Sequence, residues 1–358
     1  MKKFPFVSVR TSRPSFLILI SMFCLSSLSQ ASLYDVIDLG SLSDGGKSWA
    51  YSINDSGVVV GRAEDDSGNY IACRFNTDGS VNNLGTLTGY TSSYAYAINN
   101  DGAIVGWSQN STTDRRACTF TAGVSPASLS DNTNSMAVAI NNTGTTVGRS
   151  GRDAGETEAY NFTNTGFLGG DNSWALSINS TGTIVGSEQN GSGTDIACKF
   201  SDTGNIPLYD KRSWAYSIND GGQIVGSADN ENGFYNACIF NSDGSGINTD
   251  FGTLGGNYSL AIANNNLGQI VGYAENASGA ARACLFESST AIDLNILIDP
   301  SSGWSLRYAY DINNDGQIVG VGIRNGVERA FLLKVVPEPA TVIILALGMS
   351  LLPATKKK

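Results

Sequence analysis

Short runs of Asp and Asn are the first residues whose chemistry stands out in this sequence. Examples are Asp55, Asp65-Asp66 and Asn313-Asn314-Asp315, whose side-chain oxygens are the ligands that calcium prefers. The runs lack the spaced acidic pattern and the closing Glu of an EF-hand loop, and hairpin turns favour the same residue types. We therefore predict turn residues, no metal and no cofactor; bound calcium is the alternative.

Catalytic groups are sparse. The chain has no His, which excludes imidazole as a general base or metal ligand. Asp65 and Asp66 are adjacent in sequence, but adjacency does not direct two carboxylates at one substrate atom. No Gly-x-Ser-x-Gly elbow and no phosphate-binding loop occurs. We predict that the protein is not an enzyme.

The cysteines recur in one register, each after an Ala, at Cys73, Cys118, Cys198, Cys238 and Cys284. Equivalent positions of separate repeats lie too far apart for a disulfide, whose Cα atoms are about 5.5 Å apart. In a strand, Cys73 faces the same way as Phe75. We therefore expect small, buried apolar residues.

The elements that position these residues are internal repeats. The unit Ala-x-x-Ile-Asn-x-x-Gly-x-Ile-Val-Gly occurs seven times, at intervals of about 43 residues. Its central glycines are Gly57, Gly102, Gly144, Gly182, Gly222, Gly268 and Gly316. Repeats of this length indicate propeller blades, because solenoid repeats of similar length are usually helical. An open β-solenoid is the alternative.

The first repeat divides into four predicted strands, at 48–54, 58–63, 70–75 and 81–87, joined by Gly-containing turns. The segment 36–42 matches the fourth-strand pattern, and Arg329–Leu332 matches the third. The last repeat therefore lacks an outer strand that the N-terminal segment can supply. We predict an all-β, seven-bladed propeller over residues 32–335, closed by its N-terminal strand.

Residues that differ between repeats are the candidates for binding. The loops from strand two to three and from strand four to the next strand one share a face. On it we place Arg115, Arg116, Tyr209, Lys211, Arg212, Tyr235 and Trp304. Aromatic and charged side chains there could bind glycan or protein, although loops carry such residues anyway. Trp49, Trp174 and Trp214 share one register, and we assign them to packing between blades.

One repeat shows the shared pattern in full, at Leu254-Gly255-Gly256, Ala261, Asn265, Gly268, Ile270-Val271-Gly272, Ala283 and Phe286. By this pattern the repeats resemble the HAF-type extracellular repeat family. The resemblance spans nearly all of Ile37 to Leu333 and is degenerate in the third repeat, where Leu129-Ser130-Asp131 lacks the Leu-Gly pair and Tyr160 replaces Cys. The resemblance implies an extracellular location and brings no catalytic residues.

The two ends have the features of removable signals. Basic residues precede an apolar run at 16–25, and Ser29-Gln30-Ala31 is a small-x-small cleavage site, so residues 1–31 are a predicted signal peptide. A first transmembrane helix is the alternative.

Residues 336–358 contain Pro337-Glu338-Pro339, an apolar stretch and a Lys tail. They resemble the PEP-CTERM sorting signal of bacteria with outer membranes. The resemblance implies removal by an exosortase after transient inner-membrane anchoring; an ordinary anchor is the alternative.

These observations predict an exported, structural or adhesive protein of a Gram-negative cell surface or matrix. Its processing partners would be signal peptidase and exosortase, and its ligand an extracellular polysaccharide or surface protein. The formal charge of −10 becomes more negative when the basic ends are removed, which disfavours nucleic acid. The alternatives are a lectin-like module for matrix polysaccharide and an enzyme acting on extracellular polymer.

Overall fold

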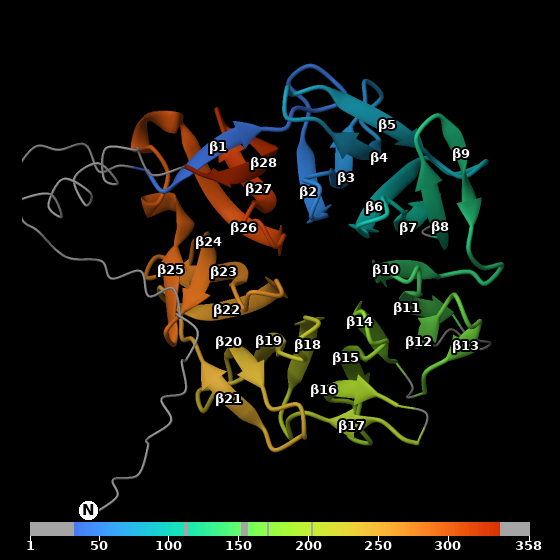
Figure 1. The fold of residues 1–358 in the computed structure, drawn as a ribbon, viewed down its shortest axis with the longest axis vertical. Helices are drawn as coiled ribbons and strands as arrows, with labels where there is room; N and C mark the ends of the chain where they lie inside the picture. The colour runs from blue at the N-terminus through green and yellow to red at the C-terminus, as the bar shows by residue number, and fades with distance from the viewer. Residues whose placement is uncertain (1–31, 111–113, 152–156, 170–171, 202, 337–358) are drawn as a thin grey trace, which may run out of the picture. The chain divides into compact units, whose positions relative to one another are not determined.

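Seven four-stranded antiparallel sheets are arranged in a ring in the computed structural model (Figure 1). The structure describes residues 32–336, except 111–113, 152–156, 170–171 and 202. Each sheet is one blade, with its first strand innermost. The predicted seven-bladed, all-β propeller is confirmed.

The strands follow the repeats closely. Blade 1 contains β2 (Ser48–Ile53), β3 (Val59–Glu64), β4 (Tyr70–Phe75) and β5 (Val81–Gly85). Blade 2 contains β6 (Ser92–Ile98), β7 (Ile104–Gln109), β8 (Arg115–Thr121) and β9 (Val124–Ser128). Blade 3 contains β10 (Met136–Ile140), β11 (Thr146–Gly151), β12 (Thr157–Asn161) and β13 (Gly166–Phe167). Blade 4 contains β14 (Trp174–Ile178), β15 (Ile184–Gln189), β16 (Asp195–Phe200) and β17 (Ile206–Pro207).

The remaining blades are built in the same way. Blade 5 contains β18 (Ser213–Ile218), β19 (Ile224–Asp229), β20 (Tyr235–Phe240) and β21 (Ile247–Asp250). Blade 6 contains β22 (Gly255–Asn264), β23 (Ile270–Asn276), β24 (Ala281–Glu287) and β25 (Thr290–Asp293), followed by the 3₁₀ turns η1 (Leu294–Ile296) and η2 (Pro300–Ser302). Blade 7 contains β26 (Trp304–Ile312), β27 (Ile318–Arg324) and β28 (Val327–Val335), and its outer strand is β1 (Tyr34–Asp38).

The N-terminal strand closes the ring, as predicted. β1 pairs antiparallel with β28, from Tyr34 opposite Val335 to Asp38 opposite Phe331. The backbone N–H of Val336 then donates to the carbonyl of Leu33, at 2.9 Å. The pairing gives β28 a partner on the side that an open array would leave exposed.

The glycine that ends each Ile-Val-Gly motif lets the two inner strands of a blade approach closely. In blade 4, β14 has a bulge between Ala175 and Ser177, opposite Gly186. A Cβ atom on Gly186 would lie 1.8 Å from the carbonyl oxygen of Trp174. Equivalent glycines in the other six blades are equally close to the first strand. Any larger residue at this position would push the two strands apart.

The apolar cores lie between neighbouring blades. Cys73 and Phe75 of blade 1 share a core with Val319 and Leu332 of blade 7, and all four are buried. Burial raises the pKa of the Cys73 thiol well above its ordinary value. The cysteines at 73, 118, 198, 238 and 284 are all free and buried, as predicted.

The predicted signal peptide, 1–31, and the sorting residues Pro337, Glu338 and Pro339 lie outside the described residues. Within residues 32–336 as described, no helix is long and apolar enough to cross a membrane.

Candidate functional site

The propeller has two faces that differ in how they are built. On the turn face lie the hairpins between strands one and two and between strands three and four. On the loop face lie the connections from strand two to three and from strand four to the next blade. The first strands of all seven blades surround the centre of the ring (Figure 1). We call this central region the channel; it contains two separate hollows.

A continuous circle of hydrogen bonds surrounds the channel on the turn face. One Asn per blade donates from Nδ2 to the backbone carbonyl of the matching Asn in the next blade, at 2.9–3.3 Å. The members of this asparagine ring are Asn54, Asn99, Asn141, Asn179, Asn219, Asn265 and Asn313, all buried. The last bond, from Asn313 to Asn54, joins blade 7 to blade 1. The ring therefore links every blade to its neighbour.

Each ring asparagine also holds its own hairpin. In blade 3, Oδ1 of Asn141 accepts hydrogen bonds from the backbone N–H groups of Thr143 and Thr145, at 3.1 and 2.9 Å. The repeated Asn thus satisfies turn groups within one blade and a carbonyl of the next. The prediction that these Asn runs are turn residues is confirmed, but it missed their contact between blades.

The next residue of each hairpin forms the mouth of the channel. Asp55 accepts hydrogen bonds from the backbone and side chain of Asn314 on one side, at 3.0 and 2.9 Å, and from Asn100 on the other, at 2.8 Å. Partial burial opposes ionisation, but these hydrogen bonds hold the pKa of Asp55 below its ordinary value. The mouth encloses a hollow of about 170 Å³. In the part of the chain that the structure describes, no three His, Cys, Asp or Glu side chains form a metal-binding group.

A second chamber of about 170 Å³ lies in the channel on the loop-face side of the isoleucines that line the first hollow. Tyrosines line part of it, at positions 51, 96, 216 and 310, and Val138, Leu176 and Ile262 line another part. Asp311 is its carboxylate: Ser52 Oγ and the Ile53 N–H each donate to Oδ2 at 2.9 Å. Burial raises the pKa of Asp311 to about 6. Sequence reasoning missed Asp311, although the other repeats carry Ser or Ala at that position.

Four of the seven residues predicted for the loop face lie close together in blade 5. The guanidinium of Arg212 lies 4.5 Å from the ring of Tyr235 and 3.1 Å from a carboxylate oxygen of Asp229. Tyr209 and Lys211 line a pocket of about 320 Å³ that Asp229 also borders. Asp229 is thus the counter-ion of Arg212 in this group of residues.

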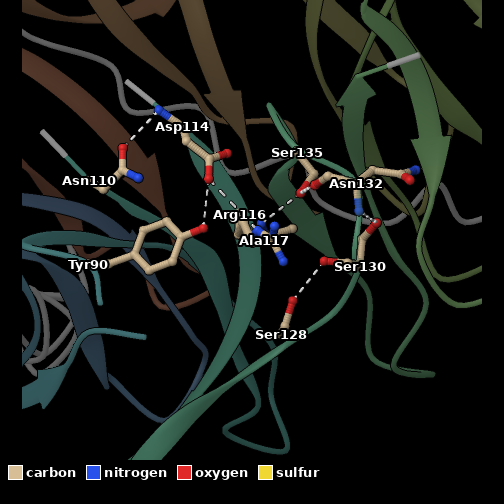
Figure 2. Close-up of polar contacts among 9 residues, drawn as sticks. All are labelled: Tyr90, Asn110, Asp114, Arg116, Ala117, Ser128, Ser130, Asn132 and Ser135. Atoms are coloured by element: carbon tan, nitrogen blue, oxygen red, sulfur yellow. Dashed lines mark hydrogen bonds and ion pairs between the residues drawn. The ribbon is translucent and has the colours of Figure 1, made fainter. Parts of the chain in front are cut away.

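The other three predicted residues lie on different blades. Trp304 begins β26 in blade 7 and packs against the core. Arg115 and Arg116 begin β8 in blade 2, where Arg116 Nε lies 3.9 Å from Asp114, which also accepts from the Tyr90 hydroxyl at 2.9 Å (Figure 2). The predicted binding residues thus form three separate groups.

Serines tie the strand around Arg116 to blade 3. The Ala117 N–H donates to Oγ of Ser135 at 3.0 Å, and Ser135 donates to the carbonyl of Asn132 at 2.9 Å (Figure 2). A serine at the start of the first strand plays the same part in other blades, as Ser93 and Ser213 do. These contacts are part of the joint between blades.

Sequence reasoning missed an aromatic group at the loop-face end of the channel. The guanidinium of Arg62 lies 4.2 Å from the ring of Trp49, 4.7 Å from Tyr70 and 4.8 Å from Tyr94 of the next blade. Tyr94 stacks on Trp107 at 5.0 Å. The signal was present in the sequence, because the residue after the glycine of each Ile-Val-Gly motif varies between blades: it is Arg62, Trp107, Arg149, Ser187, Ser227, Tyr273 and Val321.

The three tryptophans assigned to packing between blades have different surroundings. Trp174 of blade 4 lies 3.5 Å from the guanidinium of Arg149 in blade 3, which is a contact between blades. Trp49 is buried and packs edge-on against Tyr70 of its own blade. Trp214 packs in the same way against Tyr235. The prediction of inter-blade contact is confirmed for Trp174; the ring contacts of the other two lie within a blade.

Part of the chain is similar to a family described as a protein of unknown function (DUF3466). The match covers residues 34–122, which run from β1 to the residue after β8. No curated protein matches the chain.

Proposed function

We propose that the chain is an exported, non-catalytic propeller of a bacterial cell surface or extracellular matrix, and that its loop face binds a partner. One observation carries the proposal. Residues repeated in every blade, such as Asn141 and Gly186, are engaged in holding the ring together. Residues that differ between blades gather arginine and aromatic side chains on the loop face. The first set builds a scaffold, and the second is available for recognition.

Export and sorting are supported by the residue patterns of the two ends. The basic and apolar leader before Ser32 and the Pro337-Glu338-Pro339 tail would both be removed. The ring is complete between Leu33 and Val336, which are hydrogen-bonded to each other. Removal of both ends would therefore leave every pairing of the propeller in place.

The test is the intact mass of the protein recovered from culture medium and from the cell envelope. A species that begins near Ser32 and ends near Pro337-Glu338-Pro339 supports export and exosortase processing. A full-length C-terminus held in the membrane contradicts the exosortase step and makes the propeller a tethered surface domain.

A lectin-like role is the second candidate, and the half-buried aromatic side chains of the loop face favour it. Tyr209 lines the pocket of about 320 Å³, so Tyr209→Ala should remove glycan binding at that pocket. Tyr209 and Trp304 each pack against a core, so circular dichroism must show that the variant keeps its fold. Saturable glycan binding that survives Tyr209→Ala would exclude this pocket as the binding site.

An enzyme acting on extracellular polymer is the third candidate. Asp311 is the carboxyl group whose pKa, about 6, suits proton transfer near neutral pH. Its chamber of about 170 Å³ has room for a small molecule and not for a polymer chain. The size of the chamber therefore favours the binding of a small molecule over the turnover of a polymer. Turnover of a polymer that Asp311→Asn abolishes would overturn the non-catalytic proposal.

A further inference from the structure

Arginines that contact aromatic rings on the loop face are of two kinds. Arg212 and Arg324 each also pair with a carboxylate of the protein, Asp229 at 3.1 Å and Asp38 at 2.8 Å. Arg62 and Arg149 contact aromatic rings as well, but no described residue gives either of them a carboxylate partner. The difference matters because a partly buried guanidinium is stabilised by an anion.

Arg62 lies at the loop-face end of the channel, against three rings of blades 1 and 2. Its guanidinium lies within 5 Å of the ring centres of Trp49, Tyr70 and Tyr94. Its Nε is buried and has no hydrogen-bond partner among the described residues. Aromatic faces attract the cation but accept no strong hydrogen bond, so the donors of Arg62 are not satisfied by these rings.

Arg149 is in the same situation in blade 3. Its guanidinium lies 3.5 Å from the ring centre of Trp174, and its buried Nε also has no partner among the described residues. Burial and the nearby charge of Arg115 lower the pKa of Arg149 to about 10. Arg115 itself donates to the sulfur of Met136, which is opposite Arg149 in the sheet. Arg115 and Arg149 are thus two cations near each other, and among the described residues neither forms an ion pair with a carboxylate.

Aromatic rings of blade 2 lie between the two arginines in the order of the blades. Tyr94 stacks on Trp107 at 5.0 Å with an angle of 15°, and Tyr96 lies 5.0 Å from Trp107. Trp107 is half-buried and Tyr96 is exposed. We call Arg62, Tyr94, Trp107 and Arg149 the arginine–aromatic arc. They occupy three consecutive blades at the loop-face end of the inner strands.

We infer that the arginine–aromatic arc binds a carboxylated polysaccharide, such as a chain of uronic acids. Carboxylates match the planar fork of a guanidinium and would supply the partners that Arg62 and Arg149 lack. The apolar faces of sugar rings would pack on Tyr94 and Trp107, as aromatic side chains provide large, rigid contact areas. The inference rests on the proposed function, because it names the ligand class of the loop face.

Affinity electrophoresis of the full chain in gels that contain a defined polymer tests the inference. The probes are polygalacturonate, neutral amylose and polyglutamate, the last a carboxylated polymer without sugar. We expect polygalacturonate to retard the protein, amylose to retard it little, and polyglutamate to bind at least about tenfold more weakly.

Variants locate the site. Arg62→Gln, Arg149→Gln and Trp107→Ala should each weaken polygalacturonate binding about tenfold or more. The matched control is Arg324→Gln, which removes an arginine already paired with Asp38, and its affinity should remain that of the wild type. Circular dichroism of every variant confirms that the fold is intact.

Several outcomes overturn the inference. Equal retardation by polyglutamate would indicate an acidic peptide as the ligand. Equal losses in Arg149→Gln and Arg324→Gln would show a general charge effect. If amylose binds as well as polygalacturonate and this binding depends on Trp107, the ligand need not carry carboxylates. The arc would then be a lectin-like site for neutral sugar. If no polymer binds, the arc is not a polysaccharide site, whereas the mass measurement decides export independently.

Discussion

The turn face and the loop face use polar residues in opposite ways. On the turn face, the same Asn occurs in all seven blades and its donor and acceptor groups are both engaged within the protein. On the loop face, the position after the repeated glycine varies between blades; Arg62 and Arg149 occupy it in blades 1 and 3, and their buried Nε atoms have no partner among the described residues. The difference teaches that the repeated Asn is satisfied within the ring, whereas this variable position leaves guanidinium donors without a described protein partner, as the proposed binding site requires.

The largest effect should come from a repeated glycine. Gly186→Ala places a Cβ 1.8 Å from the Trp174 carbonyl oxygen, so β14 and β15 must separate. We expect a loss of more than about 3 kcal/mol in the free energy of unfolding, measured by urea denaturation. Gly191→Ala is the control, because Gly191 lies outside the repeat motif and has open space around it. Similar losses of stability in both variants would show that the close approach of the strands at Gly186 is not what makes this glycine necessary.

The next largest effect should come from the asparagine ring. Asn141→Ala removes one donor to Asn179 and the acceptor for the N–H groups of Thr143 and Thr145. The buried groups left without partners should cost about 3–5 kcal/mol, measured by urea denaturation. Asn142→Ala, an exposed neighbour that accepts one hydrogen bond from Asn100, should cost about 1 kcal/mol or less. A small effect at Asn141 would mean that packing alone holds the blades together.

A pH-dependent effect should come from Asp311, an unrepeated residue in the channel. Burial raises its pKa from 3.8 to about 6, so the folded protein binds more protons than the unfolded chain between these values. The contribution of Asp311 to stability therefore falls as pH rises from about 4 to about 6, by about 3 kcal/mol, and is constant above. Asp311→Asn should remove this loss, so its advantage in melting temperature over the wild type should grow across that range. A pH-independent difference would show that Asp311 ionises normally.

The smallest effect on stability should come from the arginine–aromatic arc. Arg149→Gln relieves the cost of burying a cation near Arg115 but loses the contact with Trp174 of the next blade; the two effects oppose each other, so the free energy of unfolding should change by about 1 kcal/mol or less. Arg212→Gln, which loses its pair with Asp229, should lose about 1 kcal/mol or less. Thermal melts of both variants give the comparison. A large loss of stability in Arg149→Gln would show that Arg149 stabilises the fold, as the repeated residues of the turn face do, and would contradict its assignment to a binding surface.

The sequence predicted the parts of the fold that depend on local pattern. Seven motifs predicted the number of blades, and the match of segment 36–42 to a fourth strand predicted that the N-terminal segment completes the last blade; the structure pairs Tyr34–Asp38 with β28. Burial of Cys73 beside Phe75 followed from the two-residue period of a strand.

Contacts between blades were harder to predict. A hairpin alone explains Asn141, so nothing in the local pattern indicated its bond to Asn179. Likewise, the contact of Arg62 with Tyr94 joins two blades, and its distance depends on how the sheets pack. The seven residues predicted for the loop face lie in three groups for the same reason: sequence gives the blade and the strand end, but not the distance across the ring.

Closure by β1 and β28 also sets the order in which the molecule can be completed. Its last pairing joins the first and last strands of the described chain, so a chain that emerges from a membrane in sequence order cannot finish folding until Val335 has emerged. Until then the blades form an open array that leaves one face of the first blade and one face of the newest blade uncovered and β1 unpaired. If the chain is exported as proposed, it must be kept from self-association for the whole time that its passage takes, and Leu33 and Val336 meet only when that time ends.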